Sequence, residues 1–193
     1  MRQHRDVVVI GSGIAGLCAA ITAKEAGLDV LVLSKADSPA ETNTNYAQGG
    51  IIARGRDDSP ELLAKDVLEA GVQLNKQDAV RLLAEEGPDL VYSFLVDKVG
   101  VAFSRDSDGG LDYTEEAAHS SRRILHFEDH TGDAIESALL AYARLVGVDI
   151  RPAATAVDLI TNNHHSSDSQ EIYREREVLG CYVMDNRTGT VDT

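Results

Sequence analysis

The chain has 193 residues, of which 43% are hydrophobic and 26% are charged. This balance is typical of a soluble globular protein and excludes a chain that is mainly disordered, because the apolar residues suffice for a core. With 18 Lys and Arg residues against 32 Asp and Glu residues, the formal net charge is −14, which disfavours nucleic acid and membranes as partners. No apolar run approaches the roughly 20 residues needed to cross a bilayer.

The two cysteines, Cys18 and Cys181, are too few for a disulfide scaffold and lack the spacing of metal ligands. They favour a reducing, cytoplasmic setting. The N-terminal sequence MRQHRDVVVIGSG has only a short apolar run, whereas the apolar core of a secretory signal needs about 7–15 residues. We therefore interpret it as a first strand.

The first elements form a strand–helix–strand unit. Residues 6–10 predict a strand buried on both faces, because four β-branched residues follow one another. Residues 14–25 predict a helix that stops at Gly27, and residues 28–33 predict a second buried strand. Such a crossover should be right-handed, with parallel strands.

The middle of the chain is less regular. Residues 34–58 show no periodicity and predict a long loop, which in a compact protein is usually functional or disordered. Helical spacing returns at residues 60–70 and at about 77–97, interrupted near Gly87-Pro88. An Asp-Gly-Gly turn within residues 103–113 predicts a hairpin.

The last third returns to alternating helix and strand. Residues 131–146 predict an amphipathic helix, and residues 162–171 a polar loop. Four strands are expected, at residues 148–150, 154–160, 178–184, and 190 onward. The last of them begins a pattern that the sequence does not complete. The expected fold class is α/β, Rossmann-type, with a parallel sheet in three layers.

The sequence GSGIAG follows the first strand and opens the first helix. Its glycines, Gly11, Gly13 and Gly16, fit the pattern G-x-G-x-x-G. Gly11 permits a tight turn, Gly13 lets the backbone approach a pyrophosphate, and Gly16 lets the helix pack close to the sheet. The alternative is a glycine-rich corner without a ligand, but it gives no reason for three glycines in this register. The pattern therefore predicts dinucleotide binding at a helix N-terminus.

The end of the second strand bears on which dinucleotide is bound. Most NAD-binding units have an acidic residue there for the adenosine ribose, whereas this chain has Ser34 followed by Lys35. The missing acid weakens an NAD interpretation. Lys35 is either a ligand of a phosphate or ribose oxygen, or a solvated charge in the loop.

Three segments together carry a resemblance to a known family. These are LSK at 33–35, NTNYAQGGI at 43–51 and EEAAHSSRRILHFEDHTG at 115–132. In these segments the chain resembles the L-aspartate oxidases, which belong to the succinate dehydrogenase/fumarate reductase flavoprotein superfamily. The resemblance covers the chain from Asp6 to its final strand.

The resemblance implies that FAD occupies the glycine turn, and it implies the residues that contact it. Gly49 and Gly50 would bring bare backbone against the flavin, and Thr44 and Gln48 would offer hydrogen bonds. The backbone near Ala156 and Val157 would touch the adenine. The residues expected to contact FAD are Gly11, Ser12, Gly13, Ile14, Ala15, Gly16, Ser34, Lys35, Asn43, Thr44, Asn45, Tyr46, Ala47, Gln48, Gly49, Gly50 and Val157.

Asn43 distinguishes members of the superfamily. The respiratory flavoproteins carry a histidine at this position, four residues before the alanine of the loop, and it bonds covalently to FAD. An amide cannot form that bond. The resemblance therefore implies non-covalent FAD and favours the aspartate oxidases.

Glu116 matches a glutamate that the resemblance assigns to recognition of the substrate ammonium group. A carboxylate suits that role, and a plain dicarboxylate has no need of it. Alternatively, Glu115 and Glu116 are two exposed acids in a loop.

A basic cluster lies nearby, formed by Arg122, Arg123, His119, His126 and His130. It either guides an anionic substrate or orders the loop, or else it forms ordinary ion pairs with Glu115, Glu128 and Asp129. The i, i+4 spacing of His126 and His130 suits zinc, but no third ligand is evident, so no metal site is expected. His164 and His165 are expected to be solvated.

The resemblance implies one FAD-binding domain over 1–193, with a helical and hairpin excursion at 53–130 and a return over 131–193. It also implies an N-terminal piece of a longer enzyme, because relatives carry their proton-transfer and carboxylate-binding residues further along. No catalytic residue is expected in this piece, which alone should be inactive. The intact enzyme would oxidise L-aspartate with oxygen or fumarate as acceptor and would feed quinolinate synthase in NAD biosynthesis. Alternatives are a soluble fumarate reductase-like flavoprotein and a non-catalytic dinucleotide-binding module.

Overall fold

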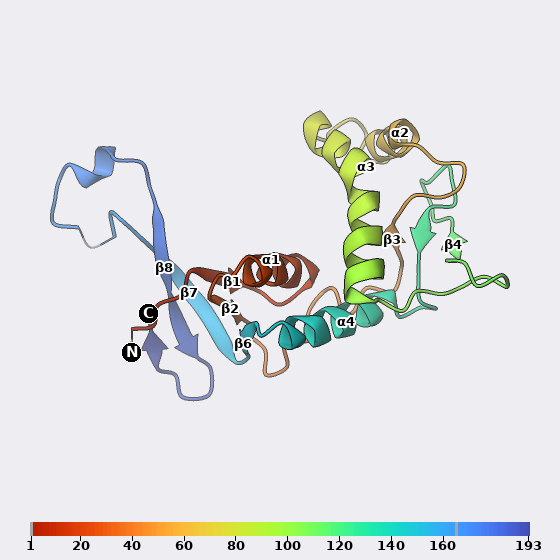
Figure 1. Cartoon of the computed structure of the whole chain (residues 1–193). Coiled ribbons are helices and arrows are strands. Elements are labelled where there is room, and N and C mark those ends of the chain that lie inside the picture. Colours follow the sequence, from red (N-terminus) through yellow and green to blue (C-terminus); the bar gives the residue numbers. More distant parts are fainter. Residues whose placement is uncertain (1, 165) are drawn as a thin grey trace. The chain divides into compact units, whose positions relative to one another are not determined.

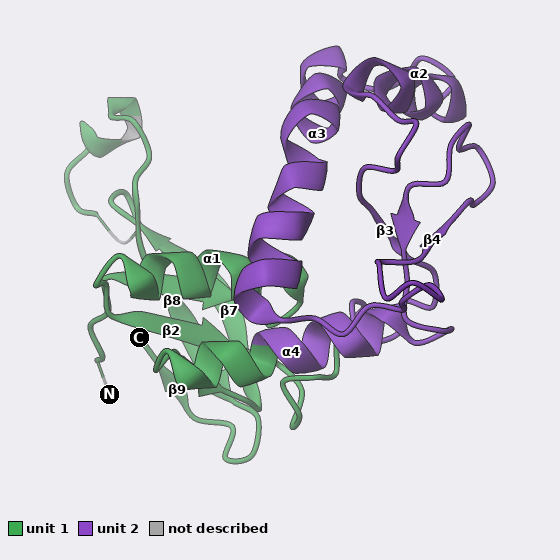
Figure 2. Cartoon of the chain, turned by 45° about the vertical axis from the view of Figure 1, so that its right-hand side comes forward, with its two compact units in different colours: residues 1–42, 140–193 green, residues 43–139 purple. Residues whose placement is uncertain are grey.

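The computed structural model describes residues 2–164 and 166–193. The chain forms two compact units, shown in different colours in Figure 2. Unit 1 comprises residues 1–42 and 140–193, and unit 2 comprises residues 43–139. The domain boundaries expected from the sequence stay a prediction.

Unit 1 contains the parallel sheet expected from the sequence. Its strands are β1 (Val7–Ile10), β2 (Val30–Leu33) and β6 (Asp149–Arg151), in the order β1-β2-β6. Helix α1 (Ile14–Glu25) joins β1 to β2, and all neighbouring strands run parallel (Figure 1). The strand–helix–strand unit is therefore confirmed, and the glycine turn lies at the carboxyl end of β1. In open α/β sheets this is the edge at which ligands bind.

The core of this sheet lies around β2, whose four residues are all buried. Leu17 and Ile21 of α1 are fully buried as well. The expectation that β1 is buried on both faces was wrong, because Val8 is 38% exposed and Ile10 is 56% exposed. Val8 and Ile10 are two positions apart and therefore lie on the same face of the strand. Among the described residues, nothing buries this face completely.

A second sheet of unit 1 is antiparallel and confirms the strands expected near the end of the chain. It comprises β7 (Ala154–Thr161), β8 (Val178–Asp185) and β9 (Val191–Asp192). Between β7 and β8 the polar segment includes a short 3-10 helix, η2 (Glu171–Tyr173). The pairing of β7 with β8 shifts register between Ala156 and Asp158, so Val157 lies in a bulge.

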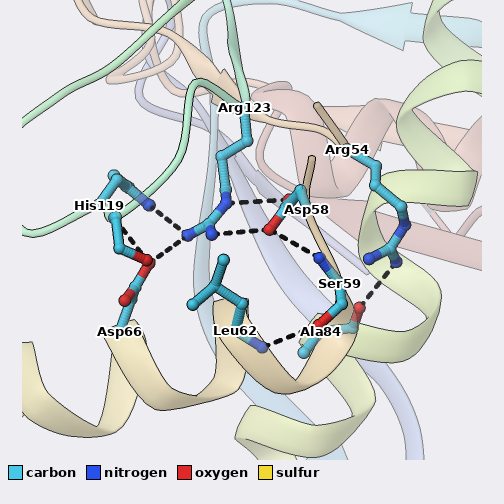
Figure 3. A network of polar contacts seen from close by, with 9 residues as sticks. Arg54, Asp58, Ser59, Leu62, Asp66, Ala84, His119 and Arg123 are labelled. Carbon is cyan, nitrogen blue, oxygen red and sulfur yellow. Dashed lines mark hydrogen bonds and ion pairs between the residues drawn. The ribbon is translucent and has the colours of Figure 1, made fainter. Parts of the chain in front are cut away.

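Unit 2 contains two helices predicted from their helical spacing, α2 (Pro60–Ala70) and α3 (Gln77–Leu90). The expected interruption at Gly87-Pro88 was wrong: α3 continues through Pro88, and the helix then widens into a π-helix, η1 (Val91–Val99). Proline has no N–H for the carbonyl four residues earlier. That carbonyl, of Ala84, accepts a hydrogen bond from Arg54 Nη2 at 3.0 Å instead, as Figure 3 shows.

A small antiparallel sheet completes unit 2, with the order β3-β5-β4. Its two-residue strands are β3 (Ile51–Ile52), β4 (Tyr113–Thr114) and β5 (Ile124–Leu125), and neither β3 nor β5 was predicted. The expected hairpin is confirmed by the antiparallel bridge between Arg105 and Leu111.

Helix α4 (Thr131–Leu145) confirms the amphipathic helix expected at 131–146. Its residues up to 139 belong to unit 2 and the later ones to unit 1. Within the part of the chain that the structure describes, no helix is both long enough and apolar enough to cross a membrane.

Candidate functional site

The glycine turn of unit 1 has the backbone that its sequence requires. Gly11 has a φ of 107°, a conformation that favours glycine, and its N–H donates to the Leu33 carbonyl at 2.9 Å. A Cβ on Gly16 would overlap the carbonyl oxygen of Gly11. Gly16 must therefore be glycine for α1 to pass this close to the turn.

The N-terminus of α1 is suited to an anion. The N-cap residue of α1 is Gly13, so no side chain forms a capping hydrogen bond with the first turn. That turn also contains no acidic residue. The N–H groups and the positive end of the helix dipole at such a terminus attract phosphate. Gly13 and Ile14 are half-buried and Ala15 is exposed.

Ser12 has a structural contact. Its side chain is buried, and its hydroxyl donates to the Pro39 carbonyl at 2.7 Å. Ser12 therefore joins the glycine turn to the segment that follows β2. Its hydroxyl is therefore already used, and the FAD contact expected at Ser12 stays a prediction for its backbone.

The segment after β2 holds Lys35 by its backbone. Ser34 is buried and donates its N–H to the Arg151 carbonyl at 2.9 Å, whereas Lys35 is exposed. The amide of Asn186 donates to the Lys35 carbonyl at 2.7 Å, a contact that the sequence analysis did not find. Val157 is 56% exposed in its bulge.

The Asn43–Gly50 segment lies in unit 2, and most of its residues are exposed. Thr44 and Asn45 are half-buried, and the other six residues are exposed. The N–H of Gly132, in the first turn of α4, donates to the Ala47 carbonyl at 2.9 Å. A Cβ on Gly132 would overlap the carbonyl of Thr44. Gly132 therefore supports the segment and was missed, although the Thr-Gly pair at a helix start was a usable signal.

The other end of this segment contacts Glu116. The N–H of Gly50 donates to Glu116 Oε1 at 3.1 Å. A Cβ on Gly50 would overlap the Ile124 side chain and the Leu125 carbonyl, so close packing against β5 requires this glycine. Within unit 2 the structure thus brings together the expected substrate residue and the expected flavin segment.

A buried ionic network orders the loops beside Glu116 (Figure 3). The Arg123 side chain is fully buried, and its Nη2 lies 2.7 Å from Asp58 Oδ1 while its Nη1 lies 2.5 Å from Asp66 Oδ2. Nη1 also donates to His119 Nδ1 at 3.1 Å. Asp66 in turn accepts hydrogen bonds from the N–H and the hydroxyl of Ser120, each at 2.9 Å.

The network shifts the pKa of both charges. Burial alone would raise the pKa of Asp66, but the hydrogen bonds from Ser120 and Arg123 outweigh it and lower that pKa. Burial likewise acts to lower the pKa of Arg123, and its contacts with Asp58 and Asp66 raise it instead. Arg123 therefore stays charged and orders the loops, and it is not accessible to guide a substrate.

The partners expected for the remaining basic residues need correction. Arg122 donates to the Tyr113 carbonyl and lies 3.8 Å from Asp112, and His126 lies 3.4 Å from the same carboxyl group. His130 pairs with Asp129 as expected. His164 contacts the Leu159 carbonyl and packs edge-on against Tyr182, so it is not simply solvated, and His165 lies outside the described residues.

Among the described residues, Glu128, Asp129 and His130 could present three ligand atoms to a metal within 4.8 Å of one another. All three are exposed, and exposed acidic groups gather in this way without a metal. His126, which was considered as a zinc ligand together with His130, does not belong to this group of described residues.

The fold and the turn are those of a dinucleotide-binding protein, because a parallel strand–helix–strand unit has a glycine turn packed closely against an uncapped helix N-terminus. The profile of the FAD-binding domain family matches residues 6–193. The chain therefore belongs to this family, and FAD is its cofactor.

The most similar curated relatives that we compared are L-aspartate oxidases, which confirms the resemblance seen in the motifs. The enzyme of Halobacterium salinarum is 46% identical over 158 residues, covering 81% of this chain and 30% of that protein. The enzyme of Pseudomonas aeruginosa is 40% identical over 204 residues, covering 100% of this chain and 36% of that protein. The chain thus spans about a third of the length of these relatives.

Solved structures place the fold in the same superfamily. The Sdh1 complex of Mycobacterium smegmatis matches with a TM-score of 0.83 and 28% identity, covering 100% of this chain and 32% of that chain. The quinol fumarate reductase of E. coli matches with a TM-score of 0.84 and 25% identity, covering 100% of this chain and 31% of that chain. The α/β fold with a parallel sheet, expected from the sequence, is confirmed.

Proposed function

We propose that this chain is the FAD-binding part of an enzyme that oxidises L-aspartate to iminoaspartate and passes the electrons to oxygen or fumarate. The 46% and 40% identities to proteins named L-aspartate oxidase support the proposal. The observation that carries it in the structure is the Glu116 carboxylate, which lies on the Asn43–Gly50 segment. A carboxylate there suits an amino-acid substrate.

The glycine turn and the Asn43–Gly50 segment are the proposed contacts of FAD. In unit 1, the backbone of Gly11–Gly16 would hold the pyrophosphate, and Lys35 would reach a phosphate or ribose oxygen. In unit 2, the exposed backbone from Asn43 to Gly50 would contact the flavin. FAD when bound supplies the acceptor for the hydride of the substrate Cα. The chain's own residues bind and orient it.

Glu116 is the proposed contact of the substrate ammonium group. A carboxylate that pairs with an ammonium favours aspartate over dicarboxylates that lack one. We propose that other parts of the enzyme bind the substrate carboxylates and move the proton, because this chain spans about a third of the length of its relatives. Glu116 thus provides selectivity, and the chemistry needs the rest of the enzyme.

The substitution Glu116→Gln in the full-length enzyme tests this function. The loss of an ion pair worth about 1.5–3 kcal/mol should raise KM for aspartate by about tenfold or more. KM for fumarate should change little. Steady-state kinetics with each substrate, with Glu115→Gln as the matched control, gives the answer. Equal effects on aspartate and fumarate would contradict the role.

A fumarate reductase-like activity is the second candidate, because solved structures of that superfamily share the fold at 25–28% identity. The higher identity to aspartate oxidases and the amide at Asn43 favour the first candidate. Peroxide formation that depends on aspartate would support it, and reduction of fumarate without aspartate oxidation would support the second.

The proposed product, iminoaspartate, also indicates which enzyme uses it next. Iminoaspartate is unstable in water, so we propose that quinolinate synthase takes it up at the start of NAD biosynthesis. We further propose a reducing, cytoplasmic setting, although several plant relatives are named chloroplastic. Cys18 and Cys181 are both free, and burial raises the pKa of the Cys18 thiol to about 11, so it stays protonated.

A further inference from the structure

The contact between Glu116 and Gly50 joins residues 66 positions apart. Glu116 Oε1 accepts the Gly50 N–H at 3.1 Å, and a Cβ on Gly49 would lie 3.1 Å from Oε1 and 3.6 Å from Oε2. The carboxylate therefore lies directly over two consecutive glycines, where a larger residue would crowd it. A charged acceptor forms a stronger hydrogen bond with a backbone N–H than a neutral one.

The backbone around Glu116 is held in place from the other side. The N–H of His119 donates to the Glu116 carbonyl at 3.1 Å, and Ala118 adopts a φ of 71°, which closes a tight turn. Ser120, which follows His119, donates hydrogen bonds from its N–H and its hydroxyl to the buried Asp66 carboxylate. The turn that carries Glu116 is thus anchored to the buried network of Arg123, although Glu116 itself is exposed.

The flavin segment has a second anchor on the same unit. The Gly132 N–H holds the Ala47 carbonyl, and the Ala47 N–H donates to Thr44 at 3.1 Å. Residues 44–47 are therefore fixed by α4. The Gln48–Gly50 end contains two glycines, which are the least restricted residues of the backbone. Gly50 packs against β5, and Glu116 adds a side-chain contact to this end.

We propose that Glu116 is a positioning residue for the flavin segment as well as a contact of the substrate. Oε1 holds the Gly50 N–H and orders the Gln48–Gly50 backbone for FAD, and Oε2 is left for the ammonium group of an amino-acid substrate. The second half of this statement rests on the proposed function, and the first half does not. One carboxylate would thus couple substrate binding to the order of the cofactor segment.

Substitutions that separate charge from acceptor geometry test this proposal in the full-length enzyme. Glu116→Gln keeps an oxygen that can accept the Gly50 N–H but loses the charge. Glu116→Ala loses both, and Glu116→Asp keeps the charge but withdraws the oxygen by one methylene. Glu115→Gln is the matched control, because Glu115 is the adjacent exposed acid. Circular dichroism and Tm of each apoprotein verify folding.

Two dissociation constants are measured for each variant. FAD affinity comes from the quenching of flavin fluorescence on titration of apoprotein, and aspartate affinity from the change in flavin absorbance under anaerobic conditions. Loss of one charge-assisted hydrogen bond predicts FAD binding weaker by about tenfold in Glu116→Ala and Glu116→Asp. Glu116→Gln keeps a neutral, weaker acceptor, so its FAD affinity should fall by about threefold, between wild type and Glu116→Ala, while its aspartate affinity falls about tenfold.

The outcomes separate the two claims. If Glu116→Ala binds FAD as tightly as wild type, the positioning role is wrong, even where aspartate affinity falls. If Glu116→Gln loses as much FAD affinity as Glu116→Ala, the acceptor that the amide retains contributes nothing to FAD binding, and the proposal also fails. If FAD affinity follows the expected order but aspartate affinity is unchanged, positioning stands and the proposed substrate recognition does not.

Discussion

At the scale of single residues, two glycines show how a missing Cβ shapes the expected FAD site. Gly16 allows α1 to approach the Gly11 carbonyl, and Gly132 allows α4 to approach the Thr44 carbonyl. Neither side chain could be added without moving backbone. At both positions the absence of a Cβ lets two backbone segments lie close together. These glycines therefore shape the expected site although they have no side chain to contact a ligand.

Gly16→Val should therefore weaken FAD binding by about tenfold or more, because the start of α1 must move away from the turn that holds the pyrophosphate. Gly180→Ala is a suitable control, since a Cβ there meets nothing within 4 Å. Fluorescence titration of each apoprotein with FAD measures the effect. Equal affinity in Gly16→Val and wild type would show that the phosphates lie elsewhere.

Asn43 predicts the linkage of the cofactor. An amide cannot form the covalent bond that a histidine forms with FAD at this position in the respiratory flavoproteins. Acid precipitation of the holoprotein should therefore release all flavin into the supernatant, where absorbance near 450 nm measures it. A pellet that keeps its yellow colour after washing would mean that FAD is covalently bound through another residue.

The Arg123 network predicts how stability depends on pH. Because the folded protein lowers the pKa of Asp66, this group stabilises the fold above its unfolded pKa of about 3.9 and loses that effect as pH falls. Asp66→Asn should be less stable than wild type at pH 7, and the difference should shrink below about pH 4. Urea unfolding at both pH values measures this, and a difference that stays constant with pH would contradict it.

Removal of the buried cation should cost more. Arg123→Met leaves Asp58 and Asp66 buried without their partner, which typically destabilises a protein by about 3–5 kcal/mol. Exposed Arg122→Met should change the free energy of unfolding by less than about 0.5 kcal/mol. A small effect of Arg123→Met in urea unfolding would show that water enters to solvate the two carboxylates.

The sequence pointed to many candidate residues, because glycines at a turn and a chemical difference at Asn43 have direct physical meanings. It did not reveal that the Ser12 hydroxyl is already bonded to Pro39, nor that Asn186 holds Lys35. Those contacts join residues far apart in the chain, so no local pattern could signal them. The partners of Arg123 were mispredicted for the same reason.

At the scale of elements, helical spacing predicted the helices, and the structure shows what marks the start of one of them. Helix α2 begins after Ser59, whose hydroxyl accepts the Leu62 N–H, and has proline at its first position. The unpredicted β3 and β5 have two residues each, too few for any alternation to appear. They form because they pair with each other across the chain.

Helix α3 shows tertiary contact overriding a local signal. Proline normally ends or kinks a helix, but here Arg54 occupies the carbonyl of Ala84 that Pro88 leaves without a donor. The sequence could not predict this partner from 30 positions away. The helix changes type only after Leu90, where the π-helix η1 begins.

A double-mutant cycle tests this explanation. Arg54→Met should leave the Ala84 carbonyl without its partner and cost about 1–3 kcal/mol in urea unfolding. In a Pro88→Ala background the new N–H can bond that carbonyl, so the same substitution should cost about 1 kcal/mol less. Strict additivity of the two substitutions would contradict the compensation by Arg54.

At the scale of the whole molecule, composition and chain order predicted the class of protein well. The parallel sheet of unit 1 follows from apolar runs on either side of a helix, which fold in only one common way. The division at residues 43 and 139 was not evident from composition. It depends on which loops pack together, and that information lies in contacts such as those of Arg123.

The most direct measurement is a crystal structure of the protein saturated with FAD. The account predicts that the pyrophosphate lies on the backbone of Gly11–Gly16 at the start of α1, and that the isoalloxazine ring contacts Asn43–Gly50 with Glu116 still bonded to Gly50. Phosphates bound away from the glycine turn, or a flavin ring that leaves residues 43–50 in solvent, would contradict it.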